Sequence, residues 1–214
     1  MKNQRIKHII WDWNGTLIND AWLFVELMNE ELNDRGLPII NINDYKQNFT
    51  FPVKKYYENL GFNFKIENFK EVGHNFIQKY KLRKNEPQLY PETKLILERI
   101  LNHGISQSII SAQENNLLKE SIQFYQLNDF FNSIKGIDNY YADNKIDIAQ
   151  KNRQQIKCHS TEIMMVGDTV HDYEVAQNLG IQCILFSGGH YTKKRLQKTQ
   201  AIIINNLLEV EQYL

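Results

Sequence analysis

The sequence predicts an α/β protein with a Rossmann-like, mostly parallel sheet flanked by helices and an inserted all-helical cap domain. Three observations lead to this prediction. Short apolar runs rich in Ile and Val end in polar or turn residues, which is typical of buried strands. Helical patterns separate these runs, as they do in βαβ units. One long stretch, from about residue 17 to residue 86, has helical periodicity without a convincing strand.

The predicted strands are short and are bounded by Gly, Ser, Asp or Asn. They cover Ile6–Trp11, Ile105–Ile110, Ile163–Val166, Gln182–Phe186 and Ala201–Ile204. The predicted helices of the core follow these strands, and Gly104 and Gly180 are expected to end two of them. These helices cover Glu92–His103, Asn115–Tyr125, Lys145–Lys157, Val170–Leu179 and Leu207–Leu214.

The long helical stretch is predicted to be a second, smaller domain inserted after the first strand. Apolar residues recur there at helical spacing, for example Phe69, Val72 and Phe76. Pro87 and Pro91 mark the return to the sheet. The predicted domains are therefore an α/β core of residues 1–16 and 87–214 and a helical cap of residues 17–86.

Composition excludes several classes of function. The 214 residues include 25 Lys and Arg against 25 Asp and Glu, and this zero net charge argues against a nucleic-acid binder. No apolar run approaches the roughly 20 residues of a membrane span, and the polar N-terminus does not resemble a secretion signal. Cys158 and Cys183 lack the spacing of a zinc site. We expect a soluble, cytoplasmic protein with no nucleic-acid or membrane partner, and its oligomeric state stays open.

Polar residues follow several of the predicted strands. Open α/β sheets bind ligands at the carboxyl ends of their strands, so these residues are candidates for a site. The first stretch, "IIWDWNGTL", places Asp12 directly after a strand, and Lys145 begins the helix that follows Ser133–Ile137. The candidate residues are Asp12, Asn14, Thr16, Ser111, Lys145, Asp168 and Asp172.

These residue types suit phosphoryl transfer. Carboxylates supply the oxygen ligands that Mg²⁺ prefers, and the ion often keeps waters and a substrate phosphate as further ligands. A carboxylate can also attack phosphorus and form an aspartyl-phosphate. A lysine and backbone amides would stabilise the negative charge of the transferring group.

The motifs resemble those of the haloacid dehalogenase-like (HAD) hydrolase superfamily. "DWNGT", "SIIS", Lys145 and "GDTVHD" are similar to its D-x-D-G-T motif, its strand ending in Ser or Thr, its Lys and its G-D-x-x-x-D motif. The first and fourth motifs are specific. The Ser and Lys motifs are informative only because all four motifs occur in the order found in the family. The helical insertion resembles the cap of the branch that includes phosphoglycolate phosphatases. The resemblance spans nearly the whole chain.

The resemblance implies a Mg²⁺-dependent phosphatase that hydrolyses a small phosphorylated metabolite through an aspartyl-phosphate. Asp12 would be the nucleophile, and the implied catalytic residues are Asp12, Asn14 and Lys145. The implied metal ligands are Asp12, the backbone carbonyl of Asn14, Asp168 and Asp172, the last either directly or through water. The residues expected around the phosphate are Trp13, Asn14, Gly15, Ser111, Ala112 and Lys145.

Asn14 departs from the family pattern, because the family's phosphatases have an acid/base Asp at this position. An amide has no proton to transfer in the useful range. One reading is a phosphatase whose substrate has a good leaving group, or one that recruits His171, His190 or a cap residue as another acid/base. Others are a slow enzyme or regulatory phosphate-ester binder, an engineered Asp→Asn exchange, and deamidation of Asn14. A last one is a phosphonate hydrolase with Lys54 or Lys55 as a Schiff-base lysine.

The inserted cap is expected to select the substrate, since it closes over the cleft and limits access to small molecules. The sequence does not distinguish phosphoglycolate, a sugar phosphate and a nucleotide. The candidate cap contacts are Asn19, Asp20, Phe49, Thr50, Phe51, Lys54, Tyr56 and Arg83.

Overall fold

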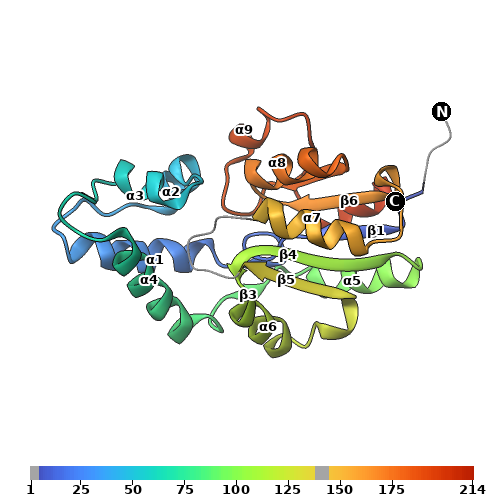
Figure 1. Ribbon diagram of the computed structural model, residues 1–214, viewed down its shortest axis with the longest axis horizontal. Helices are drawn as coiled ribbons and strands as arrows, with labels where there is room; N and C mark the ends of the chain where they lie inside the picture. The colour runs from blue at the N-terminus through green and yellow to red at the C-terminus, as the bar shows by residue number, and fades with distance from the viewer. Residues whose placement is uncertain (1–4, 138–144) are drawn as a thin grey trace.

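The computed structural model describes residues 5–137 and 145–214, and a six-stranded parallel sheet forms its centre (Figure 1). The strand order is β5-β4-β1-β6-β7-β8, and every neighbouring pair runs parallel. The predicted α/β fold is confirmed. The strands are β1 (His8–Trp11), β4 (Ser106–Glu114), β5 (Ser133–Ile137), β6 (Ile163–Gly167), β7 (Gln182–Phe186) and β8 (Ile202–Ile204).

The observed strands differ from the predicted ones in two places. The edge strand β5 was not among the predicted strands, because Lys135 and Gly136 interrupt its apolar pattern. The strand predicted to end at Ile110 continues to Glu114, through residues that line the end of the sheet. These polar residues do not look like strand residues in the sequence, because they face a cavity and not a core.

Four helices cover the sheet, two on each face. They are α5 (Thr93–Asn102), α6 (Asn115–Phe124), α7 (Lys145–Gln155) and α8 (Val170–Leu179). Shorter elements complete the core: α9 (Lys193–Leu196) and the 3₁₀ helices η1 (Asn128–Phe130), η2 (Ser160–Glu162) and η3 (Leu207–Tyr213). The α-helix predicted at the end of the chain is therefore a 3₁₀ helix.

Alternation along β1 divides the core into two apolar layers. Ile9 and Trp11 pack on one side with residues of α5, α6 and η3. Ile10 packs on the other side with residues of α7 and α8 and belongs to the same cluster as the cap. All three side chains are fully buried, so both faces of β1 are covered, as in other central strands of parallel sheets.

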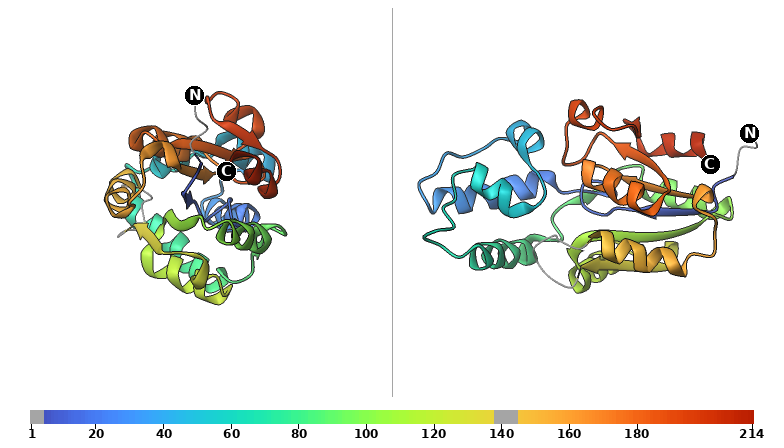
Figure 2. Two further views of the ribbon diagram at one scale, coloured as in Figure 1. Left: turned by 90° about the vertical axis from the view of Figure 1, so that its right-hand side faces the viewer. Right: turned by 45° about the horizontal axis from the view of Figure 1, so that its top comes forward.

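The cap helices gather at one end of the molecule, beyond the carboxyl ends of the strands (Figures 1 and 2). They are α1 (Ala21–Asn33), α2 (Ile42–Asn48), α3 (Val53–Asn59) and α4 (Phe69–Arg83). The two connections to the core pair with each other through the short antiparallel strands β2 (Ile18–Asn19) and β3 (Gln88–Leu89). We keep the division into a core of residues 1–16 and 87–214 and a cap of residues 17–86 as a proposal.

Two further expectations concern the whole chain. In the part of the chain that the structure describes, none of the helices combines the length and the apolar character needed to cross a membrane. Cys158 and Cys183 are both free thiols, and Cys183 is buried among the apolar residues of β7. Burial raises the pKa of the Cys183 thiol above its ordinary value.

Candidate active site

Asp12 lies where β1 ends and a tight loop begins. Its backbone N–H donates to the carbonyl of Val166 at 2.9 Å, which fixes the end of β1 against β6. The chain then folds back, because the N–H groups of Thr16 and Leu17 donate to the carbonyl of Trp13. This loop carries both Asp12 and Asn14 to the end of the sheet.

Gly15 allows this loop to approach its neighbours closely. Its φ of +74° lies in the left-handed region, and a Cβ there would lie 2.2 Å from the His190 ring and 2.4 Å from an Asp168 oxygen. Any larger residue would push the loop away from β6. The Gly15 N–H donates to Ile18 O and to Asp20 Oδ1. This N–H therefore stabilises the loop and does not bind a ligand.

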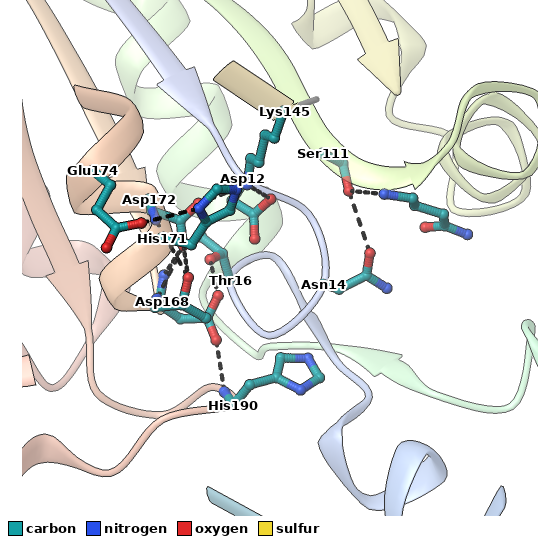
Figure 3. A network of polar contacts seen from close by, with 12 residues as sticks. Asp12, Asn14, Thr16, Ser111, Lys145, Asp168, His171, Asp172, Glu174 and His190 are labelled. Atoms are coloured by element: carbon teal, nitrogen blue, oxygen red, sulfur yellow. Dashed lines mark hydrogen bonds and ion pairs between the residues drawn. The ribbon is translucent and has the colours of Figure 1, made fainter. Parts of the chain in front are cut away.

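Three carboxylates meet at this end of the sheet. Asp12 follows β1, while Asp168 and Asp172 follow the neighbouring strand β6, and all three are buried. One ligand oxygen from each lies within 4.8 Å of the others. The structure therefore brings together the three carboxylates that the sequence predicted as a set (Figure 3).

Lys145 supplies the positive charge of this cluster. Its Nζ donates to Asp12 Oδ1 at 2.5 Å and to Asp172 Oδ1 at 2.6 Å, and its side chain is 3% exposed. Burial lowers the pKa of Lys145, but the two carboxylates outweigh it, so the pKa rises. Lys145 begins α7 and reaches the cluster from there, and the "ADN" before it in the sequence lies outside the described residues.

The three carboxyl groups have different environments. Burial raises the pKa of Asp12 well above its ordinary value, Lys145 opposes the rise, and the other two carboxylates add to it. Burial also raises the pKa of Asp168, to about 6, although His190 lowers it. The pKa of Asp172 is lowered, because the charge and hydrogen bond of Lys145 and the hydroxyl of Thr169 outweigh burial.

Asp168 and Asp172 are held by the chain around them. Asp168 accepts from Thr16 Oγ1 at 2.9 Å and from the backbone N–H of His190 at 2.6 Å. Asp172 Oδ2 accepts from the N–H and the hydroxyl of Thr169, at 3.0 and 2.7 Å, within the capping box of α8. Each carboxylate thus joins the cluster and also fixes a local turn.

Asn14 links the core to the cap. Its amide donates to Asp20 Oδ2 at 2.6 Å and to the hydroxyl of Tyr80 at 3.3 Å. Its carbonyl oxygen accepts from Ser111 Oγ at 3.3 Å (Figure 3). The side chain that departs from the family pattern is thus fully engaged in hydrogen bonds.

Asp20 and His190 form a buried pair behind Asn14. Asp20 Oδ1 lies 3.1 Å from His190 Nε2, and His190 Nδ1 lies 2.7 Å from the hydroxyl of Tyr45. Burial lowers the pKa of His190, but the hydrogen bond and charge of Asp20 outweigh it, so the pKa rises. The result is a continuous chain of polar contacts from Ser111 through Asn14 and Asp20 to the cap.

A cavity of about 140 Å³ opens in front of Asp12, between core and cap. Among the residues predicted around the phosphate, Asn14, Ser111, Ala112 and Lys145 line it. Ser111 also accepts from the backbone N–H of Gln113 at 3.1 Å, which turns its hydroxyl toward Asn14. His171 and His190 line the same cavity.

Trp13 does not lie where the sequence predicted, which was beside the phosphate. Its side chain is fully buried, lies 5.8 Å from the ring of Tyr125, and is absent from the described cavity lining. Gly15 is absent from that lining too. Position next to Asp12 in the sequence does not fix the direction of a side chain, because the loop turns immediately after Asp12.

Only some of the predicted cap contacts line the cavity. Phe49, Phe51 and Tyr56 line the cavity. Arg83 instead pairs with Glu26 and Glu86, each at 2.7 Å. The remaining candidates do not belong to the described lining, and they are Asn19, Asp20, Thr50 and Lys54.

Sequence reasoning missed several lining residues of the cap. They include the aromatic residues Phe24, Tyr45, Phe76 and Tyr80. The sequence predicts Phe76 only as part of an apolar helical face, because a core face and a cavity face have the same spacing. The signal that distinguishes this cap is its number of aromatic residues at such positions.

The cluster fits a hard divalent cation such as Mg²⁺. It offers three buried carboxylates, and Mg²⁺ prefers oxygen ligands. Asp12 Oδ1 is bound to Lys145, whereas Asp12 Oδ2 accepts no hydrogen bond from the residues that the structure describes. The chemistry of this donor set therefore agrees with the metal that the sequence predicted.

Comparisons with known proteins agree with this geometry. The family model of the haloacid dehalogenase-like hydrolases matches residues 9–186. The phosphoglycolate phosphatase of Aliivibrio fischeri is 24% identical over 120 residues, which are 55% of this chain and 52% of that protein. The chain spans about half the length of the curated relatives it matches.

Solved structures share the whole fold at low sequence identity. A haloacid dehalogenase-like family hydrolase from Streptococcus pneumoniae has a TM-score of 0.75 and 20% identity, over 100% of this chain and 99% of that chain. CbbY from Rhodobacter sphaeroides, in complex with phosphate, has a TM-score of 0.75 and 15% identity, over 96% of each chain.

Removing the charge of Lys145 tests the electrostatic balance of the cluster. We expect Lys145→Met to lower the free energy of unfolding by about 3–5 kcal/mol, because it leaves buried carboxylates without their cation. Urea unfolding at pH 7 with a chelator present measures the effect. The matched control is Lys151→Met, an exposed lysine on the same helix. Equal stability of the two variants would contradict the balance described above.

Proposed function

Because the chain belongs to the haloacid dehalogenase-like hydrolases, we propose that it is a Mg²⁺-dependent phosphatase that acts through an aspartyl-phosphate on Asp12. The observation that carries this proposal is the placement of Asp12. It is buried, lines the cavity between core and cap, and shares Lys145 with Asp172. The proposed substrate is a small phosphate ester, since the cavity measures about 140 Å³.

The proposed nucleophile is Asp12 Oδ2. Lys145 binds the other oxygen and so fixes the orientation of the carboxylate. In the first step Asp12 Oδ2 forms a bond to phosphorus, and the leaving oxygen departs with the bonding electron pair. In the second step a water oxygen attacks phosphorus, a proton is lost to solvent, and the Asp12 carboxylate is released with inorganic phosphate.

The chain's other residues bind and orient the phosphoryl group in this proposal. Ser111 and Ala112 line the cavity beside Asp12, and the Ser111 hydroxyl would donate to a phosphoryl oxygen. Mg²⁺, held by Asp12, Asp168, Asp172 and the Asn14 carbonyl, would supply positive charge next to those oxygens. Lys145 offsets the negative charge of the carboxylates.

Asn14 leaves the proton transfer without its usual group. Its amide carries no acidic proton and is already bonded to Asp20 and Tyr80. This observation supports a second candidate function, a phosphate-ester binder with slow turnover. It does not support the phosphonate alternative, since neither Lys54 nor Lys55 belongs to the described cavity lining.

Removing the nucleophile tests the proposed function. We expect the protein to release phosphate from acetyl phosphate when Mg²⁺ is present, and Asp12→Asn to abolish the release, because an amide does not attack phosphorus. Phosphate release under steady-state conditions measures both. The control is Asp129→Asn, which changes an exposed aspartate far along the chain. Turnover that survives Asp12→Asn would overturn the proposal.

Restoring a carboxylate at residue 14 tests the role of Asn14. Asn14→Asp alone would set two carboxylates against each other, because the Asn14 amide lies 2.6 Å from Asp20. The double variant N14D/D20N exchanges the carboxylate and the amide and keeps one hydrogen bond between them. We expect it to raise kcat/KM for an alkyl phosphate by at least about 100-fold, the usual contribution of a general acid.

The same double variant should change kcat/KM for acetyl phosphate much less, because kcat/KM reports formation of the aspartyl-phosphate and that leaving group needs no proton. Steady-state kinetics on both esters give the comparison. An equal change on both esters, or no change on the alkyl phosphate, would show that the residue at position 14 does not limit proton transfer.

A further inference from the structure

The cavity in front of Asp12 is walled by aromatic side chains from all four cap helices. Phe24 comes from α1, Tyr45 from α2, Tyr56 from α3 and Phe76 from α4. The rings of Phe24 and Phe76 lie 5.6 Å apart between their centroids. The volume of about 140 Å³ is close to that of an engineered apolar cavity of about 150 Å³ that binds benzene. One aromatic ring therefore fits in this aromatic chamber.

The aromatic chamber offers no free cation to an anionic substituent. Among the lining residues that the structure describes, Lys145 is the one Lys or Arg side chain, and two carboxylates already share it. Of the lining histidines, His171 lies 3.3 Å from Glu174 and His190 lies 3.1 Å from Asp20. A substrate carboxylate would be buried without a cation to pair with it, which costs several kcal/mol. A leaving group such as glycolate is therefore a poor match.

Two lining side chains have buried polar atoms without a partner among the described residues, and they are Tyr56 and Gln113. The hydroxyl of Tyr56 is buried, and the described part of the chain gives it no hydrogen bond. Because buried hydroxyls are normally hydrogen-bonded, this one fits a polar substituent on an otherwise apolar ligand. The wall thus matches a ring with a hydroxyl or carbonyl group better than a plain alkyl chain.

The missing acid at residue 14 points to the same class of ligand. An aliphatic alcohol is about as weakly acidic as water, with a pKa of about 15.7, so its alkoxide leaves only with help from an acid. A phenol has a pKa of about 10, as the side chain of Tyr does, so its phenolate leaves without that help. Asn14 supplies no proton. A phenolate can leave without one, whereas the departure of an alkoxide becomes slow.

We propose that the substrate is an aryl phosphate, a monoester whose phosphate is attached directly to an aromatic ring that lies in the aromatic chamber. This proposal rests on the proposed phosphatase function of Asp12. Asp12 Oδ2 forms the bond to phosphorus, the bond between phosphorus and the aryl oxygen breaks, and the electron pair leaves with the phenolate. Solvent then protonates the phenolate, and water hydrolyses the aspartyl-phosphate as described above.

A panel of four phosphates distinguishes the effect of the ring on kcat/KM from the effect of the leaving group. Phenyl phosphate has both features, benzyl phosphate has a ring on an alkyl oxygen, 2-phosphoglycolate has neither, and acetyl phosphate has only a good leaving group. We expect kcat/KM to be about 100-fold higher for phenyl than for benzyl phosphate, because only benzyl alkoxide needs an acid. Benzyl phosphate should exceed 2-phosphoglycolate, through a lower KM, because its ring is buried in the chamber.

Gly73 provides a variant that fills the chamber. It lines the cavity from α4, and a Cβ at this position meets no atom within 4 Å. Gly73→Leu should fold, since leucine favours a helix more than glycine does. We expect it to lower the ratio of kcat/KM for phenyl phosphate to that for acetyl phosphate at least tenfold. Gly73→Ala is the matched control, and its ratio should fall much less.

The outcomes distinguish this proposal from the proposed function. If acetyl phosphate is hydrolysed only with Asp12 intact, but 2-phosphoglycolate is preferred to phenyl phosphate or Gly73→Leu leaves the ratio unchanged, the aryl phosphate proposal is overturned and the phosphatase stands. If no ester is hydrolysed, calorimetric binding decides. Tighter binding of phenylphosphonate than of phosphonoacetate supports the chamber's preference for a ring, and the reverse order overturns it.

Discussion

The ion pairs of Lys145 with Asp12 and Asp172 are the contacts on which the rest of the site depends. Three buried carboxylates within 4.8 Å of one another repel, and burial makes each charge more costly. One lysine shared between two of them offsets part of this cost. The third carboxylate, Asp168, depends on hydrogen bonds from Thr16 and from the backbone of His190.

This arrangement also explains why the loop after β1 is so compact. Thr16 and Gly15 bring the loop against Asp168, and Gly15 leaves no room there for a side chain. The order of the strands makes this possible, since β1 and β6 are neighbours and end at the same edge of the sheet. Fold and site are therefore fixed by the same few contacts, and a change in the loop would move Asp12 as well.

Much of this could be predicted from the sequence, because the relevant signals are local. A carboxylate directly after an apolar run marks a strand end, and parallel strands bring such ends together, which placed Asp12, Asp168 and Asp172 in one set. The partners of Asn14 could not be found in this way. Asp20 is near it in sequence, but the loop has to turn before the two side chains meet, and Tyr80 comes from a distant helix. The inward direction of Trp13 likewise follows from the turn and not from its neighbours.

In the proposed intermediate, Asp12 carries the phosphoryl group. Reaction with acetyl phosphate and Mg²⁺, followed by borohydride reduction and peptide mass spectrometry, tests it most directly, because borohydride converts an aspartyl-phosphate to homoserine. We expect homoserine at residue 12, in high yield, since Asn14 cannot activate the water that would hydrolyse the intermediate. Homoserine at another aspartate, or an unmodified Asp12 in protein that turns over, would contradict it.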